Sequence, residues 1–170
     1  GMSPNWNYLM EKKAYEIIHS ENKNAKVGIS YLYNWYTAQN SNLIEKIADR
    51  FAEWFRIKLL GNKIKGFQDY LGINYYRLGL IKFDPKKSMY FGFRIEEDEK
   101  NVMKWVAYPI GIYKVLKEAN ENNPGLSIYI LENGMPDDDV IEDGERIKFI
   151  KEHLKYVAQA MKEGVDVRGY

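Results

Sequence analysis

The 170-residue sequence contains no cysteine and only two histidines. Without cysteine, the chain can form no disulfide, no zinc–thiolate site and no cysteine nucleophile. It also lacks any stretch near the roughly 18 consecutive apolar residues of a membrane-spanning helix, and no signal-peptide pattern opens it. We therefore expect a cytoplasmic protein that does not contact a membrane.

An excess of charge of one sign is also missing, because Lys and Arg number 25 against 24 Asp and Glu. The two signs are interspersed, so there is no basic patch of the kind that binds nucleic-acid phosphates. His19 and His153 show no metal-ligand spacing, and we expect both to be surface or capping residues. Asp137 to Asp139 lack the other ligands of a calcium loop, and no glycine-rich phosphate loop occurs. No nucleic-acid partner, metal or cofactor is predicted.

Aromatic residues are abundant, with 14 Tyr, 7 Phe and 4 Trp. Most of them are expected in the core or on strands, where aromatic side chains pack well. Aromatic clefts also bind sugars, so the composition is compatible with a carbohydrate ligand without indicating one. A chain of this length buries roughly 70% of the surface that its unfolded form exposes, which predicts one domain over residues 1–170.

Helical and strand patterns alternate along the chain. The predicted helices cover 7–22, 42–61, 109–122 and 144–164, and the predicted strands cover 25–30, 67–76, 126–132 and 165–170. Residues 31–40 are expected to form a loop, and 78–102 a long excursion with room for a hairpin. Strands that alternate with helices form a parallel sheet through right-handed crossovers. An open doubly wound sheet and a segment of a (β/α)8 barrel both fit this order.

In either architecture, reactive side chains belong at the carboxyl ends of the strands. Ser30, the run from Asn74 to Tyr76, Glu132 and whatever follows Tyr170 meet that condition. Glu132 is the one carboxylate among the named positions. An Asn-Gly turn signal follows it, so Glu132 is either a solvated residue before a turn or a catalytic group.

Four segments occur in one order: DYLGINYYR (69–77), MKWVAYPIGIYKVLKEA (103–119), IYILENG (128–134) and the stretch 143–170, which ends in GVDVRGY. In this order they resemble segments of the family 1 glycoside hydrolases, the retaining β-glucosidases and β-galactosidases built on a (β/α)8 barrel. One such motif alone would be weak evidence, but four in order make the resemblance specific. It implies a partial barrel that comprises approximately the fifth to eighth strands with their helices.

The resemblance also implies roles for individual residues. Glu132 matches the nucleophile that forms a glycosyl-enzyme intermediate with a β-glucoside or β-galactoside. Tyr76 matches the tyrosine that donates a hydrogen bond to the nucleophile and orients it. Asn74 matches the asparagine beside the bound sugar, and Trp105 matches the tryptophan on the leaving-group side of the cleft.

Several positions depart from the family pattern. Lys104 stands for a glycine, Val106 and Ile110 stand for two glutamates, and Leu131 stands for the threonine before the nucleophile. The Asn-Glu-Pro motif that carries the family's acid/base glutamate does not occur in the sequence.

We therefore expect a segment that is inactive alone and that pairs with a complementary amino-terminal half-barrel or with itself. A degenerate, non-catalytic sugar-binding or assembly module on the same scaffold is the alternative. An unrelated open α/β domain of the flavodoxin type is a third, weaker hypothesis.

Overall fold

The structure is a computed structural model, and it describes residues 4–38, 43–50, 66–83, 93–96, 106–136 and 143–170. Its elements are α1 (Pro4–Glu21), β1 (Gly28–Leu32), β2 (Trp35–Ala38), β3 (Tyr70–Asn74), β4 (Leu78–Phe83), β5 (Phe93–Glu96), α3 (Pro109–Asn122), β6 (Ser127–Glu132), α4 (Gly144–Lys162) and β7 (Val167–Gly169). Residues 43–50 are also helical, and the rest of the predicted helix 42–61 lies outside the described residues. Within the described ranges, no helix is long and apolar enough to cross a membrane.

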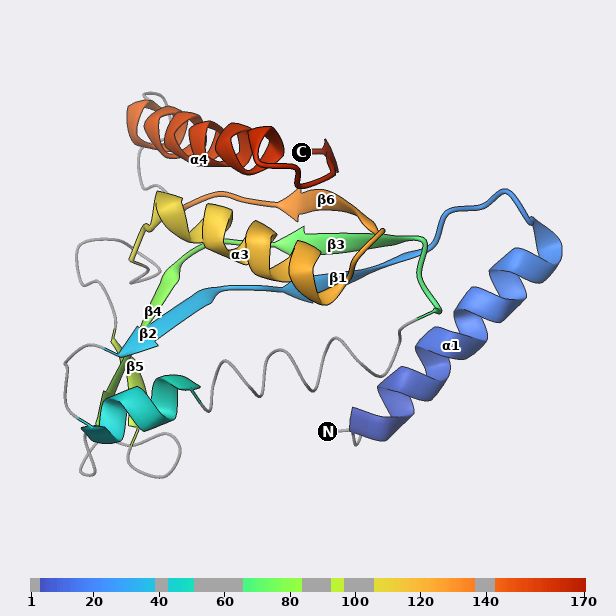
Figure 1. Ribbon diagram of the computed structural model, residues 1–170, viewed down its shortest axis with the longest axis horizontal. Coiled ribbons are helices and arrows are strands. Elements are labelled where there is room, and N and C mark those ends of the chain that lie inside the picture. The colour runs from blue at the N-terminus through green and yellow to red at the C-terminus, as the bar shows by residue number, and fades with distance from the viewer. Residues whose placement is uncertain (1–3, 39–42, 51–65, 84–92, 97–105, 137–142) are drawn as a thin grey trace.

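The main sheet has four parallel strands in the order β1-β3-β6-β7, as predicted from the alternation of strands and helices (Figure 1). A second sheet has the order β2-β4-β5, in which β4 and β5 run antiparallel. This antiparallel pair is the hairpin for which residues 78–102 had room. The predicted loop over 31–40 is wrong, because Tyr31 and Leu32 end β1 and Trp35 begins β2. Aromatic residues favour strands, and that preference outweighs the polarity of the segment.

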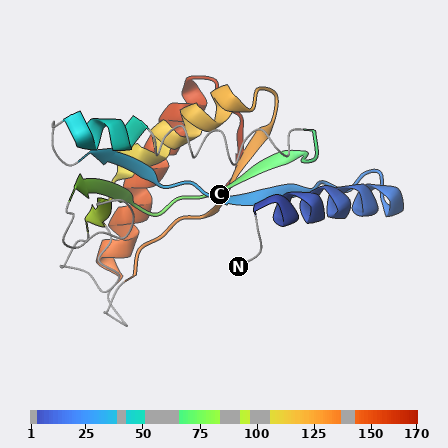
Figure 2. The ribbon, with the colours of Figure 1, turned by 90° about the horizontal axis from the view of Figure 1, so that it is seen from below.

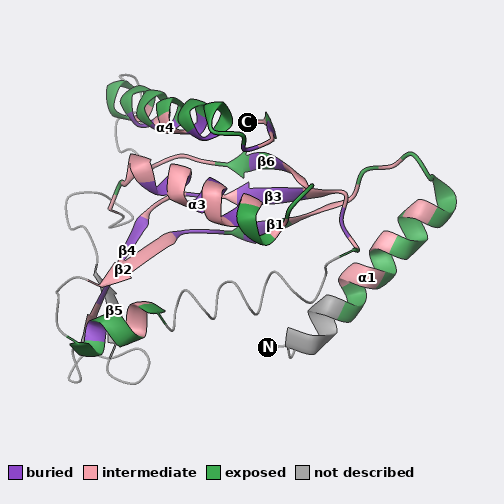
Figure 3. Ribbon diagram, in the orientation of Figure 1, coloured by how far each residue is buried: buried purple, intermediate pink, exposed green. Residues whose placement is uncertain are grey.

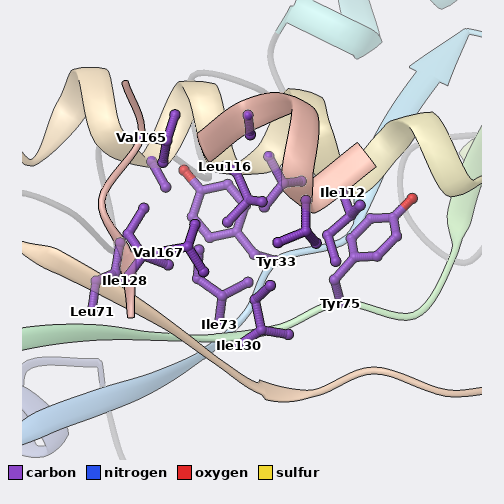
Figure 4. Packing of buried hydrophobic residues seen from close by; sticks show 14 of the residues in the cluster. Tyr33, Leu71, Ile73, Tyr75, Ile112, Leu116, Ile128, Ile130, Val165 and Val167 are labelled. Atoms are coloured by element: carbon purple, nitrogen blue, oxygen red, sulfur yellow. The ribbon is translucent and has the colours of Figure 1, made fainter. Parts of the chain in front are cut away.

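The hydrophobic core lies on one face of the main sheet. Alternate residues of β3 and β6, namely Leu71, Ile73, Ile128 and Ile130, are at most 3% exposed. Figure 4 shows these side chains between the strands and α3. The core cluster also contains Val157 and Ala160 of α4. Because side chains alternate between the faces of a strand, this packing turns the intervening residues to the opposite face.

Large apolar side chains on that opposite face stay exposed. Leu32 is 59% exposed and Leu131 is 47% exposed, and Figure 3 shows the end of β6 as exposed. A doubly wound sheet carries helices on both faces. Among the described elements, α3 and α4 form the core with one face only. We call the exposed side of the main sheet the open face.

Helix α1 lies apart from α3 and α4 in both views (Figures 1 and 2). It contacts the amino ends of β1 and β3 through Asp69, which accepts hydrogen bonds from the Tyr15 hydroxyl and the Val27 N–H. His19 Nε2 lies 2.9 Å from the same carboxylate, so this histidine is more than a surface residue. Burial alone would raise the pKa of Asp69, but the hydrogen bond from Val27 and the contact with His19 outweigh burial and hold this pKa below its usual value.

The prediction that His153 is a surface or capping residue is also wrong, because its side chain is 0% exposed. Nδ1 donates to the Phe149 carbonyl oxygen at 2.7 Å, and the ring stacks on Phe149 with centroids 3.8 Å apart. Within the described residues, Nε2 has no hydrogen-bond partner. Burial lowers the pKa of His153, and the Phe149 carbonyl and the Glu152 charge offset only part of this shift. His153 lies on the core face of α4, where the helical pattern alone did not distinguish it from the exposed positions.

Tyr75 anchors the start of α3 to the end of β3. Its side chain is 0% exposed, and its hydroxyl group donates to the Tyr108 carbonyl oxygen at 2.7 Å. Burial and the neighbouring Tyr108 raise the pKa of Tyr75, so it stays a neutral donor. A Cβ atom on Gly111, in the first turn of α3, would lie only 1.9 Å from the Tyr75 hydroxyl oxygen. Glycine at 111 therefore lets α3 approach this tyrosine.

The buried His153 predicts a pH dependence of stability. The unfolded chain takes up a proton on this residue more readily than the folded chain does. The contribution is therefore fully present above about pH 6.5 and is lost as the pH falls toward the lower folded-state pKa. His153→Phe keeps an aromatic ring at this position but removes the titratable group. It should reduce the slope of unfolding free energy against pH by up to about 1.4 kcal/mol per pH unit.

Urea unfolding at several pH values measures this slope. Leu154→Phe, which places the same ring on the exposed side of α4 and removes no titratable group, is the control and should keep the slope of the parent chain. Equal slopes for the parent and His153→Phe would contradict the prediction.

Gly111→Ala should destabilise the fold, because the new methyl group forces Tyr75 or α3 to move. Such overpacking costs about 1–3 kcal/mol. Gly144→Ala is the matched control, since Gly144 begins α4 and a Cβ atom there would meet nothing within 4 Å. We expect the control to change stability by at most about 0.5 kcal/mol. Urea denaturation of both variants checks the difference, and similar costs would show that the contact at Gly111 is not limiting.

Candidate active site

Glu132 lies at the carboxyl end of β6, directly beside the end of β3. The register pairs Ile73 with Ile130 and then Asn74 with Glu132, which leaves Leu131 without a partner in the ladder. An unpaired residue of this kind is a β-bulge, and bulges re-aim the side chains that follow them. The Tyr75 N–H donates to the Glu132 carbonyl oxygen at 2.9 Å, so the backbone of Glu132 is fixed immediately after the bulge.

The Tyr76 hydroxyl group donates a hydrogen bond to the Glu132 carboxylate. Glu132 is exposed, and Tyr76 is half-buried. The structure thus brings together two of the sequence-predicted site residues, which are separated by 56 positions in the chain. A hydrogen bond from a phenol to a carboxylate fixes the orientation of the carboxylate.

Asn74 lies beside this pair at the end of β3. Its Oδ1 accepts a hydrogen bond of 3.0 Å from the Ser30 hydroxyl group on β1. Asn74 and Glu132 therefore lie at the carboxyl ends of β3 and β6, along one rim of the sheet, as expected for parallel strands. The prediction that Ser30 ends its strand is wrong, because β1 continues to Leu32 and Ser30 is its middle residue, paired with Gly72. Trp105 and Lys104, which precede α3, lie outside the described residues, as do Asp137 to Asp139.

Asn133, directly after Glu132, is held by two hydrogen bonds. Its Nδ2 donates to the Tyr75 carbonyl oxygen at 2.8 Å, and its Oδ1 accepts from the Tyr170 hydroxyl group at 3.0 Å. In the sequence, Asn133 is recognisable only as part of an Asn-Gly turn. Its position directly after Glu132 was the available signal, because the amide of a turn asparagine often binds nearby backbone.

The open face beneath the rim is shaped by glycines. A Cβ atom on Gly72 would lie 2.5 Å from the Leu131 side chain, and one on Gly28 would lie 2.3 Å from the Tyr70 ring. Tyr70 and Tyr129 meet edge to face, with ring centroids 5.0 Å apart. Small residues thus leave room for large neighbours to lie across the strands. In the part of the chain that the structure describes, no group of three or more Asp, Glu or His side chains is arranged to hold a metal ion.

The arrangement suits nucleophilic chemistry. A carboxylate at an exposed rim is accessible to a substrate, and the phenol that binds it holds one of its oxygens in place. Carboxylates of this kind attack the anomeric carbon of sugars in retaining glycoside hydrolysis.

Comparison with known proteins gives a family match over residues 57–170, to the model described as glycosyl hydrolase family 1. Beta-glucosidase A of Thermotoga maritima is 39% identical over 108 residues, which cover 60% of this chain and 24% of that protein. The beta-galactosidase of Sulfolobus acidocaldarius is 30% identical over 97% of this chain and 38% of its own length. The chain therefore spans about a quarter to two fifths of the length of these relatives.

Solved structures give the same result for the fold. The family 1 β-glucosidase from Thermotoga maritima overlays with a TM-score of 0.80 at 25% identity, and covers 94% of this chain and 44% of that one. Its complex with glucoimidazole overlays with a TM-score of 0.77 at 26% identity. The predicted partial (β/α)8 barrel is confirmed, and the open doubly wound sheet is excluded.

Proposed function

Since the chain belongs to glycosyl hydrolase family 1, we propose that it supplies the nucleophile side of a retaining β-glycosidase site. The observation that carries the proposal is the hydrogen bond from Tyr76 to Glu132 at the carboxyl ends of β3 and β6. The active sites of (β/α)8 barrels are built at this end of the strands. The relatives named β-glucosidase and β-galactosidase support β-glucosides or β-galactosides as the substrate class.

In the first step, a Glu132 oxygen attacks the anomeric carbon of the sugar. The bond from that carbon to the leaving oxygen breaks, and an acid on the opposite side of the bond protonates this oxygen. The product is a glycosyl ester on Glu132. In the second step, water attacks the anomeric carbon, the ester bond breaks, and the same acid/base group accepts the proton from water.

The other predicted site residues act around this carboxylate. Tyr76 keeps one oxygen of Glu132 hydrogen-bonded, so the carboxylate is oriented before attack. Asn74, on the same rim, binds hydroxyl groups of the sugar. Trp105 lines the leaving-group side.

The acid/base carboxyl group comes from a complementary amino-terminal half-barrel. Two observations support this part of the proposal. The chain covers only 44% of the solved β-glucosidase, and the sequence contains no Asn-Glu-Pro motif. The open face and the edge strands β1 and β7 offer the surfaces on which such a half would pack. The two carboxyl groups would then lie about 5 Å apart, as retention requires.

Glu132→Gln should abolish turnover in the assembled protein, because an amide cannot form the glycosyl ester. The assembly to test is this chain co-expressed with the amino-terminal part of the Thermotoga maritima β-glucosidase, whose structure it overlays. Hydrolysis of an aryl β-glucoside should fall by at least about 10³-fold. Glu121→Gln is the control, since Glu121 is an exposed carboxylate at the end of α3, and it should retain full activity. Undiminished hydrolysis by Glu132→Gln would overturn the proposed role.

The chain alone should show no turnover above background, and it should self-associate through its open face. Light scattering of the purified chain measures its mass, and the same aryl β-glucoside measures its activity.

Titration calorimetry with glucose tests the alternative function, a sugar-binding module. Such a module would give heat of binding without turnover even in the assembled protein. Robust hydrolysis by the isolated chain would contradict the need for a complementary half.

A further inference from the structure

After β1 and β3 end in the main sheet, the chain continues directly into β2 and β4 of the second sheet. The last pair of the first ladder is Leu32 with Asn74, and the first pair of the second ladder is Trp35 with Leu78. Between these pairs, one ribbon has residues 33–34 and the other has residues 75–77. The second ribbon is therefore one residue longer at the bend, which is the mismatch of a β-bulge.

This extra residue leaves backbone donors that the ladders do not use, and the side chain of Asn34 accepts from them. Asn34 Oδ1 receives the N–H groups of Tyr76 and Arg77, each at 3.2 Å. Asn34 itself is only 4% exposed. A buried backbone N–H without an acceptor is costly, so the amide oxygen at this position determines which path the bend can take.

The path of the bend decides where Tyr76 points. Tyr75 turns toward the helices and binds the Tyr108 carbonyl oxygen, while Tyr76 turns the other way and reaches Glu132. Asn34 binds the backbone N–H of Tyr76 itself, so it holds the peptide that carries this phenol.

Glu132 is held by different contacts. The Tyr75 N–H binds its carbonyl oxygen at 2.9 Å, and Asn133 binds the Tyr75 carbonyl oxygen at 2.8 Å. None of these contacts involves Asn34. A change at position 34 therefore acts on the phenol side of the Tyr76–Glu132 pair and leaves the carboxylate side held.

We propose that Asn34 is a positioning residue of the site: through the backbone of Tyr76, it sets the hydrogen bond that orients the Glu132 carboxylate. This inference rests on the proposed function for its effect on turnover. The structural part of the inference, the hydrogen bond between Asn34 and the Tyr76 N–H, can be tested on the chain alone.

The test uses the assembled protein and the variants Asn34→Leu, Asn34→Asp and Tyr76→Phe. Asn34→Leu has a similar size but no acceptor, and it should lower kcat by about 10- to 100-fold, as Tyr76→Phe does, with KM changed by less than about threefold. Asn34→Asp keeps an oxygen acceptor and should retain kcat within about threefold of the parent. Asn34→Ala replaces Asn34→Leu if the leucine variant does not fold.

The decisive measurement is the double variant Asn34→Leu/Tyr76→Phe. If Asn34 acts through the Tyr76 hydroxyl group, the double variant should be no slower than Tyr76→Phe, within about twofold. A merely structural role would instead multiply the two losses. Asn123→Leu is the matched control, because Asn123 is a partly buried asparagine that binds the Ala119 carbonyl oxygen away from the site. Its kcat should equal that of the parent.

Amide hydrogen exchange on the chain alone gives a readout that needs no activity. The N–H groups of Tyr76 and Arg77 should exchange faster in Asn34→Leu than in the parent and Asn34→Asp. Unchanged exchange, unchanged kcat, or multiplied losses in the double variant would overturn the inference. The proposed function would survive those results if Glu132→Gln is inactive, and it would fall on its own if Glu132→Gln is active.

Discussion

The site depends on two irregularities in the pairing of β3 with its neighbouring strands, both at the carboxyl end of β3. On the β6 side, Leu131 has no partner, and on the β1 side the bend holds one residue more than the strand beside it. In a regular ladder, side chains alternate strictly between the two faces. The two irregularities break this alternation within a few residues of each other, and they bring the Tyr76 hydroxyl group to the Glu132 carboxylate.

Such irregular backbone needs acceptors and donors outside the ladder. Asn34 and Asn133 supply them, one from each neighbouring ribbon. Both are asparagines, whose short amide side chain can bind backbone groups that a strand leaves free. The core face of the sheet stays regular below this rim, with Leu71, Ile73 and Ile128 packed against the helices. The regular, packed part of the sheet therefore supports an irregular rim, and the candidate site residues lie at that rim.

The sequence was sufficient for the regular parts. Helix α3 runs over Pro109–Asn122, as its apolar spacing and its first-turn proline indicate, and the strand order follows from alternation. It was not sufficient where contacts between residues far apart in the chain determine the local structure. The predicted strand 67–76 ends at Asn74 because the bend begins there, and the extra residue at that bend is visible only once both ladders are aligned. Asn34 lay in a segment expected to be a loop, and nothing in the local pattern linked it to residues more than 40 positions away.

The proposed site has two geometric requirements: the orientation of Glu132 and its distance from a second carboxyl group. Tyr76 orients the Glu132 carboxylate, and Asn133 holds the backbone that follows it; both residues belong to this chain. In the proposed assembly, the distance between the two carboxyl groups, about 5 Å for retention, would be set by how a second half-barrel docks on the open face. Errors of about 1 Å in such distances cost on the order of 100-fold in rate. In that assembly, the packing across the edge strands β1 and β7 would have to be as well defined as a protein core, and the large apolar side chains on the open face are suited to such packing.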